Sequence, residues 1–516
     1  MAWRHLGLAV ALAAASQSAW AGWTEARSKH FVIYSEQNPK QLRQYAEDLE
    51  RFDQAVRLLR SMGDPELTDS GRLTIYVLPS QAAVASLAGS PGSGIAGMYV
   101  GRASGARAFV HRQRDSDNYN DLQAQTVFFH EYLHHLMLQE LELAVPAWIV
   151  EGTAELYATA SINKDGSVTV GRAAQHRAYG LFGSNQLSVE DMVGATRQKM
   201  SHAQLDQLYG RGWLLTHMLT FEPSRKGQLG RYVMGIQNGM TALNSAKAAF
   251  GDLKLLSKDL NRYLEQRKIL GLTLPANKFK VAPISLRPLS PAESAIVPVV
   301  MRSERGVGPK TAPRVLNDAR KVAARFPGDP EVLAALAEAE TDAGNHAAAV
   351  AAADEALALR PAYSKPMIMK ARAILASGQA DPAKVDWKAT RVLIGRANRL
   401  DPEHAEPLML FYQSYLQQGM EPTRNAVEGL LYAQRIVPQD GSLRMLAVRQ
   451  LIADKQLAEA RALFGPIANS PHAGESRERL QQILQALAQG NAAQAMALLD
   501  AEEADTKANG QGAASR

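Results

Sequence analysis

The stretch of sequence that decides the fold is Val127-Phe128-Phe129-His130-Glu131-Tyr132-Leu133-His134-His135-Leu136-Met137. It is rich in apolar residues and contains neither Pro nor Gly, so it predicts a buried helix. Residues four apart share one face of a helix, so His130 and His134 are expected to present two imidazoles to one point. Glu131 lies about 100° round the helix from His130, where its carboxylate reaches a water without becoming a ligand. Two nitrogen ligands with a base beside them are typical of zinc hydrolases.

A catalytic zinc needs one more protein ligand, and a second segment offers two carboxylates. Pro146 suits the first turn of another helix, on which Glu151 and Glu155 would share a face. We assign Glu151 as the third ligand and Glu155 as the acceptor for a ligand imidazole N–H, which would fix the tautomer of that ring. The residues between His134 and Glu151, positions 135 to 150, are enough for a loop that brings a second helix back beside the first. The alternatives are satisfied core histidines and solvated helix carboxylates.

The two motifs together resemble a known family. His-Glu-x-x-His followed by Trp-x-x-Glu-Gly-x-Ala-Glu, at positions 148 to 155, is similar to the gluzincins, and specifically to the peptidase MA-like group of bacterial metallopeptidase domains. Aminopeptidase N relatives carry a similar Glu-Gly segment after a slightly longer spacer. The resemblance covers residues 23–270 and implies a zincin-like α+β fold with one Zn²⁺ per chain. The metzincin pattern does not fit, because Met137 and Glu140 stand where it needs Gly and His.

The resemblance also implies where substrate would lie. In gluzincin-like folds a strand at the edge of the sheet runs above the zinc, which points to residues 95–112 as a substrate-facing strand pair; the alternative is an ordinary hairpin. Many gluzincins place a Tyr or His beyond the third ligand to hydrogen-bond the tetrahedral oxyanion. Tyr209 and His217 are the candidates here, and the alternative for each is a side chain packed in a helical interface.

The amino terminus predicts export. Residues 1–21 contain a positive start at Arg4, a short apolar run, and the small-x-small pattern Ala19-Trp20-Ala21, as in a cleavable signal peptide. We therefore expect a periplasmic protein, with secretion to the medium as the alternative. The chain has no Cys, so no disulfide stabilises it. No later stretch is apolar enough to predict an integral membrane segment. The net charge of +6 is not gathered in blocks, so no nucleic-acid partner is expected.

The rest of the first half alternates between strand and helix patterns. Strands are expected at 29–35, 73–77, 107–112 and 166–171, an amphipathic helix at about 39–60, and a helical region from 209 to about 268. Residues 272–313 contain repeated prolines and predict an extended connector with two short strands at most.

From residue 314 the chain is rich in Ala and periodic. Pro327 and Pro361 are 34 residues apart, and Gly344, Ala349 and Ala353 fall between them where the tetratricopeptide pattern has small residues. The repeats therefore resemble tetratricopeptide repeats, with an irregular helical bundle as the alternative. Stacked helix pairs of this kind bury a continuous core and offer a concave surface for a partner or substrate.

The predicted architecture is mainly α. It has a signal peptide (1–21), a zincin-like metallopeptidase domain (22–271), a proline-rich connector (272–313), tetratricopeptide-like repeats (314–505) and a polar tail (506–516). The expected function is that of an exported zinc peptidase, with the repeats binding a substrate or a protein partner. The alternative is an inactive protease-like scaffold of the cell envelope whose repeats mediate protein–protein interaction.

Overall fold

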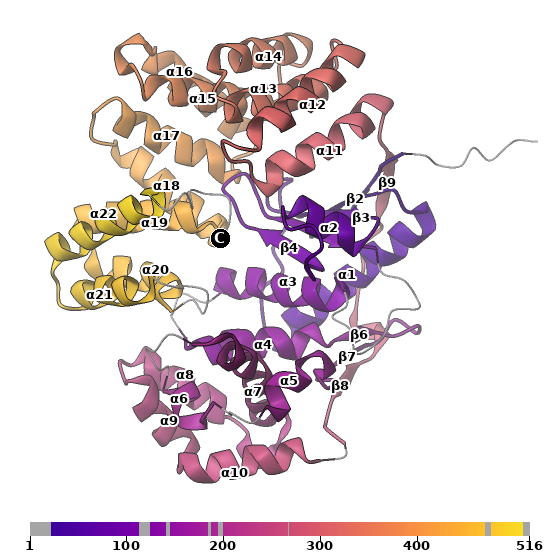
Figure 1. Cartoon of the computed structure of the whole chain (residues 1–516), viewed down its shortest axis with the longest axis vertical. Helices are drawn as coiled ribbons and strands as arrows, with labels where there is room; N and C mark the ends of the chain where they lie inside the picture. Colours follow the sequence, from indigo (N-terminus) through magenta and orange to yellow (C-terminus); the bar gives the residue numbers. More distant parts are fainter. Residues whose placement is uncertain are drawn as a thin grey trace, which may run out of the picture.

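The computed structural model describes residues 22–112, 124–140, 145–183, 187–194, 200–266, 268–469 and 476–508. The predicted signal peptide, residues 1–21, and the end of the predicted tail lie outside the described residues. Figure 1 shows a sheet-containing part from which a long array of helices arches over and down one side.

The main sheet is mixed and has the strand order β4-β5-β3-β2-β1-β9 among the described residues. Its strands are β1 (Thr24–Arg27), β2 (Phe31–Ser35), β3 (Leu73–Leu78), β4 (Gly97–Val100), β5 (Arg107–His111) and β9 (Ser285–Pro288). The three central strands β2, β3 and β5 are parallel, whereas β4, β1 and β9 join antiparallel. Strands were predicted at the positions of β2, β3 and β5, and these predictions are confirmed. Strand β9 is one of the two short strands allowed for in residues 272–313, whereas β1, only four residues long, was missed.

Successive side chains of β3 point to opposite faces of the main sheet, and helices cover both faces. Ile75 and Val77 point into the large core, where α1 (Pro39–Arg60) and α3 (Ala124–Glu140) pack. Tyr76 and Leu78 point to the other face, which is covered by α2 (Gln81–Leu87) and α11 (Pro291–Arg305). Helix α1 has the predicted bounds, and it begins where the Asn38 side chain accepts the N–H of Lys40.

A second group of helices follows α3 and packs on its far side. Its members are α4 (Ala147–Ala158), α5 (Ala178–Phe182), α6 (Val189–Val193), α7 (His202–Phe221), α8 (Gln228–Gln237), α9 (Ala242–Phe250) and α10 (Leu253–Leu264). A small antiparallel sheet, β6-β7-β8, lies beside them and consists of β6 (Ser161–Ile162), β7 (Val168–Val170) and β8 (Leu272–Leu274). Strand β7 falls in the predicted stretch 166–171.

The prediction of an extended connector was wrong for residues 291–305, which form α11. Ser290 and Glu293 build a complete capping box at its start, and Pro291 occupies the first turn, where its missing N–H has no cost. Pro298 lies inside the helix and removes one backbone bond there. The helix forms because Ile296 and Val299 pack on α12 and α13, while its other side packs on the sheet. The prolines therefore mark helix starts here as well as extended chain.

The carboxyl-terminal half is an array of antiparallel helices, as the repeats predicted, in which each helix packs on its neighbours in sequence. We call α11–α22 the repeat array. After α11 it consists of α12 (Ala312–Arg325), α13 (Pro330–Asp342), α14 (His346–Leu359), α15 (Ser364–Gly378), α16 (Trp387–Leu400), α17 (Ala405–Gln417), α18 (Arg424–Ile436), α19 (Gly441–Ala453), α20 (Leu457–Ala468), α21 (Arg477–Ala488) and α22 (Ala492–Ala508). Small residues such as Ala349 and Ala353 are fully buried and let helices approach closely. Helix α22 runs past residue 506, where the polar tail was predicted to begin.

The repeat array is docked on the turn between β4 and β5. The backbone N–H of Ala103 donates to Asp440 Oδ2 at 2.6 Å, and Ala103 is buried among array residues that include Tyr412 and Leu443. A Cβ at Gly101 would lie 2.6 Å from a side-chain carbon of Gln439, so the close approach requires glycine. Further along the contact, Arg107 of β5 pairs with Glu304 of α11 at 2.9 Å. This side of the sheet is thus held by α11 at the start of the array and by the loop before α19.

Among the described residues, no helix combines the length and apolarity needed to cross a membrane.

Asp440→Ala is expected to lower the free energy of unfolding by about 2–4 kcal/mol. It removes the cap that Asp440 provides to Leu443 N at the start of α19, worth about 1 kcal/mol, and leaves the buried Ala103 N–H unpaired at about 1–3 kcal/mol. Chemical denaturation measures the loss, and hydrogen exchange at the Ala103 amide should become faster.

Asp329→Ala is the matched control, because Asp329 caps α13 within the same array and bonds only the nearby N–H groups of Glu331 and Val332. It should cost about 1 kcal/mol. Equal losses for the two variants, with unchanged exchange at Ala103, would show that the contact with the β4–β5 turn contributes nothing.

Candidate functional site

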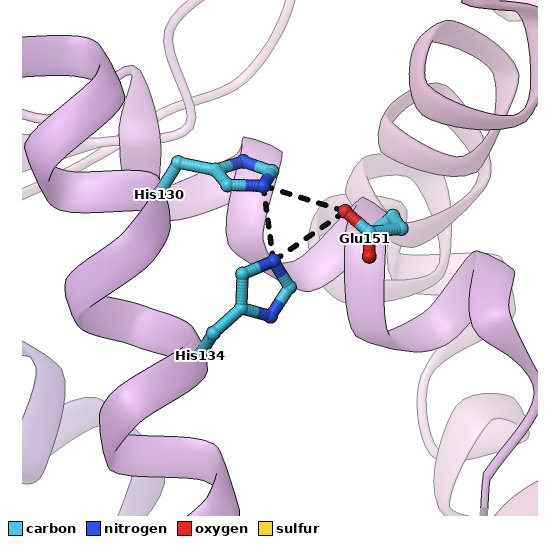
Figure 2. Close-up of side chains that lie close together, drawn as sticks. All are labelled: His130, His134 and Glu151. Atoms are coloured by element: carbon cyan, nitrogen blue, oxygen red, sulfur yellow. Dashed lines mark hydrogen bonds and ion pairs between the residues drawn. The ribbon is translucent and has the colours of Figure 1, made fainter. Parts of the chain in front are cut away.

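Two buried helices bring three side chains to one point. His130 and His134 project from α3, and Glu151 projects toward them from α4, as Figure 2 shows. Nε2 of His130 lies 3.0 Å from Nε2 of His134. Glu151 Oε2 lies 3.3 Å from Nε2 of His130 and 3.4 Å from Nε2 of His134. The structure therefore brings together the three residues that the sequence predicted as metal ligands.

The triangle fits a tetrahedral zinc ion. Ligand atoms at about 2.0–2.1 Å from such an ion lie about 3.3–3.4 Å from one another, close to the distances found here. Among the described residues, Glu151 Oε2 is buried and accepts no hydrogen bond of normal geometry, although buried carboxylate oxygens normally have a partner. Two imidazole nitrogens and a carboxylate oxygen are also a common donor set of zinc hydrolases.

The electrostatics of the triangle favour positive charge at its centre. Burial alone would lower the pKa of His130, but the Glu151 and Glu155 carboxylates outweigh it and raise the pKa to about 10. Burial alone would raise the pKa of Glu151, but the His134 and His130 imidazoles hold it well below its usual range. A dication at the centre would take the place of the imidazole protons that Glu151 attracts.

Glu155 anchors the ring of His130. Its Oε1 lies 3.0 Å from Nδ1 of His130, the nitrogen that faces away from the triangle. Oε2 is 2.8 Å from Nε2 of His176, and Oε1 accepts from Arg177 at 2.5 Å. The sequence pointed to Glu155 but not to His176 or Arg177. Both lie about twenty residues beyond α4, in a short 3-10 turn whose place in the fold no local pattern indicates.

Glu131 occupies the side of α3 next to the triangle. Its carboxylate is half-buried and makes no hydrogen bond or ion pair with another described residue. Burial, followed by the negative charge of Glu131, raises the pKa of Tyr99 on β4 well above its usual value. Burial and nearby carboxylates, Glu131 among them, also raise the pKa of Tyr209 on α7. Glu131 is therefore within electrostatic reach of a tyrosine on each side.

The structure separates the two candidates for oxyanion stabilisation. The Tyr209 ring lies 6.0 Å from the ring of His130, and the guanidinium of Arg177 stacks 4.6 Å above it. His217 is fully buried, and its two ring nitrogens bond the hydroxyl of Tyr263 and the carbonyl of Gly171. Tyr209 thus lies beside the triangle, and His217 is packed in the core.

A second histidine–carboxylate group stabilises the fold. His30, Glu50 and Asp53 are close enough to hold a metal ion, and all three are buried. However, Nδ1 of His30 bonds Glu50 at 2.8 Å and Nε2 bonds an oxygen of Asp64 at 2.9 Å. Asp53 is neutralised by Arg57 and accepts the hydroxyl of Tyr132 on α3. These side chains satisfy one another, so the group ties α1 to the helix that carries the histidine pair.

The carboxylate of Glu151 is positioned by a contact between two glycines. Gly152, on α4, lies against Gly212 of α7, and a Cβ at Gly152 would overlap the carbonyl oxygen of Gly212 and approach Thr216 Oγ1 to 2.5 Å. Only the absence of a side chain lets α4 lie this close to α7. The Gly in the Trp-x-x-Glu-Gly segment therefore sets the position of the neighbouring glutamate.

No protein-family model and no curated protein matches the chain. Two solved structures show a distant likeness. A thermophilic TPR protein from Thermus thermophilus is 18% identical, with 37% of this chain and 97% of that chain covered and a TM-score of 0.31. Yeast Tom70 is 13% identical, with 60% of this chain and 68% of that chain covered and a TM-score of 0.25. At such TM-scores neither likeness bears on function.

Gly152→Ala is expected to destabilise the chain by about 1–3 kcal/mol, because the added methyl group pushes α4 away from α7. The displacement moves Glu151 with it, so the affinity for zinc should fall as well. Thermal unfolding and a zinc titration with a competing chelator measure the two effects.

Gly395→Ala is the matched control, since a Cβ there has room, with its nearest neighbour 3.7 Å away. It should raise helix stability slightly and leave zinc affinity unchanged. Unaltered stability and zinc affinity in Gly152→Ala would mean that the contact between α4 and α7 does not position the carboxylate.

Proposed function

We propose that this protein is an exported zinc-dependent peptidase in which His130, His134 and Glu151 hold the metal. The observation that carries the proposal is the buried triangle of two imidazole nitrogens and one carboxylate oxygen, with the Glu131 carboxylate, unpaired among the described residues, beside it. Bound zinc would supply a Lewis acid that polarises a peptide carbonyl and lowers the pKa of water toward about 7.

Glu131 is the proton carrier in this proposal. Its oxygens make no hydrogen bond or ion pair with any residue that the structure describes, and it is half-buried next to the ligands. It accepts a proton from the attacking water and delivers it to the leaving amine, so water adds across the C–N bond and Glu131 ends unchanged. General acid–base catalysis of this kind contributes about 10²–10⁴-fold to a rate.

Tyr209 is proposed as the donor to the oxyanion that develops on the substrate carbonyl. Burial and the surrounding carboxylates raise its pKa, so the phenol keeps its proton at neutral pH and remains a donor. Glu155 holds the ring of His130 through Nδ1, which leaves Nε2 as the ligand atom.

The substrate is proposed to bind as an extended strand along β4. This strand is at the edge of the main sheet, so one row of its backbone groups lacks a partner strand among the described residues. Strand β4 also lies directly on α3: a Cβ at Gly97 would come within 2.8 Å of the Val127 side chain. A peptide paired with β4 would run beside the helix that carries the histidines.

Glu131→Gln should retain zinc and fold but lose about 10²–10⁴ of the rate of peptide hydrolysis, because an amide accepts no proton at neutral pH. Glu151→Gln should weaken zinc binding itself by roughly tenfold or more, because the replacement is neutral and a poorer ligand. Zinc content and the cleavage of a fluorogenic peptide library are measured for both variants.

Glu66→Gln is the control, since the Glu66 side chain is 93% exposed and its ion pair is with Lys29, outside both motifs. Near-normal cleavage by Glu131→Gln would remove the base from the mechanism. Full zinc retention by Glu151→Gln would remove it as a ligand. A wild-type chain that binds no zinc and cleaves no peptide would favour the scaffold alternative, in which the repeat array carries the function.

A further inference from the structure

A hollow of about 430 Å³ lies in the repeat array between α16 and α17. One wall is a single face of α16, formed by Lys388, Arg391, Gly395 and Arg399 at spacings of three and four residues. A second hollow of about 250 Å³ adjoins it, shares Arg399 and adds Arg396. The larger volume falls within the range of about 300–1,000 Å³ that is usual for ligand sites.

The positive charge around these hollows is not balanced. Helix α16 carries four basic side chains and no carboxylate. Within the described part of the chain, no ion pair involves Lys388, Arg396 or Arg399, whereas about half of the other arginines of the array pair with acids, as Arg372 and Arg449 do. Arg391 bonds only neutral groups, namely Ser414 and Gln418. The hollow therefore attracts an anionic group.

The floor of the larger hollow is aromatic and apolar. Phe411 and Tyr415 of α17 lie edge to face with ring centroids 5.5 Å apart, and Arg391 stacks 3.8 Å above the ring of Tyr415. Val392 lines the same hollow with 57% of its surface exposed. Charge at the rim and apolar surface at the floor together suit a ligand that has both.

The fold of α16 does not require this arrangement. Lys388 is in the first turn, where a positive charge opposes the helix dipole. Gly395 is in the helix interior, where glycine costs about 1 kcal/mol relative to alanine, yet a Cβ there would have room. What the glycine does is leave the hollow open.

We propose that this hollow is a docking site for an acidic peptide segment, in which carboxylates meet Lys388 and Arg399 and a neighbouring aromatic or aliphatic side chain enters over Phe411. A peptide fits better than the alternatives. Arg391 already covers Tyr415, so successive nucleobases would find only the Phe411 ring to stack on, whereas a single peptide side chain needs no more than that. A membrane surface would need protruding apolar side chains, whereas Phe411 and Tyr415 are half-buried at the floor.

Fluorescence anisotropy of a labelled peptide that alternates glutamate and phenylalanine tests the site on the full chain. The chain carries Glu131→Gln, so that the probe stays intact if the protein is a peptidase. Lys388→Glu together with Arg399→Glu should weaken binding by at least about tenfold, as should Gly395→Leu, which fills the hollow. The same peptide with glutamine in place of glutamate should bind at least about tenfold more weakly to the parent chain.

Two controls separate the site from general charge and folding. Lys321→Glu together with Arg424→Glu changes the net charge equally at side chains that are 68% and 91% exposed elsewhere on the array, and should leave binding within about twofold. Gly230→Leu, at an exposed glycine of α8 where an added Cβ would meet no atom within 4 Å, should do the same. Equal binding by the charge-reversed pair and its control, or by Gly395→Leu and Gly230→Leu, would overturn the proposal. Vesicles of phosphatidylglycerol that bind through Lys388 and Arg399 while the peptide does not would assign the hollow to a membrane surface instead.

Discussion

The rest of the structure depends on the burial of α3 between two layers of opposite character. On the sheet side, the ring of Phe129 stacks on Phe52 of α1 with centroids 3.6 Å apart, and Tyr132 packs against Phe31 of β2. On the other side, His130 and His134 face Glu151 of α4. The aromatic residues fix the rotation of the helix, and that rotation aims both imidazoles at one carboxylate. A helix free to rotate by one residue, about 100°, would present Glu131 in their place.

Buried polar groups hold α3 in this position from both sides. The hydroxyl of Tyr132 donates to Asp53 at 2.7 Å, which ties the helix to α1. The hydroxyl of Tyr99 lies 2.8 Å from Nδ1 of His135, which ties it to β4. Burial lowers the pKa of His135 to about 4, so this imidazole is neutral at physiological pH and its Nδ1 can accept the phenol proton. The adjacent His134 and His135 thus have different roles, decided by what each ring faces.

The repeat array is joined to the same region of the sheet. The β4–β5 turn is bonded to Asp440, and Arg107 at the start of β5 pairs with Glu304, which also accepts the hydroxyl of Tyr76. Strand β4, which contacts α3, is therefore connected through a short turn to α19 of the array. The array is a structural neighbour of the candidate metal site as well as a separate surface.

Local sequence determined most of the elements and the candidate ligand set. The four-residue spacing of His130 and His134 and the stripe of α1 follow from helix geometry alone, and Asn38 begins α1 with a side-chain bond that needs no distant residue. The small residues of the array likewise indicated helix pairs.

Tertiary structure decided the rest, because the decisive contacts are distant in sequence. Strands β1 and β9 pair across about 260 residues, α11 forms because its apolar positions are covered on two sides, and His176 and Arg177 reach Glu155 only once α4 and α7 are packed. The sequence could name Glu151 as a ligand, but its distance from the imidazoles depends on how closely Gly152 lets two helices approach.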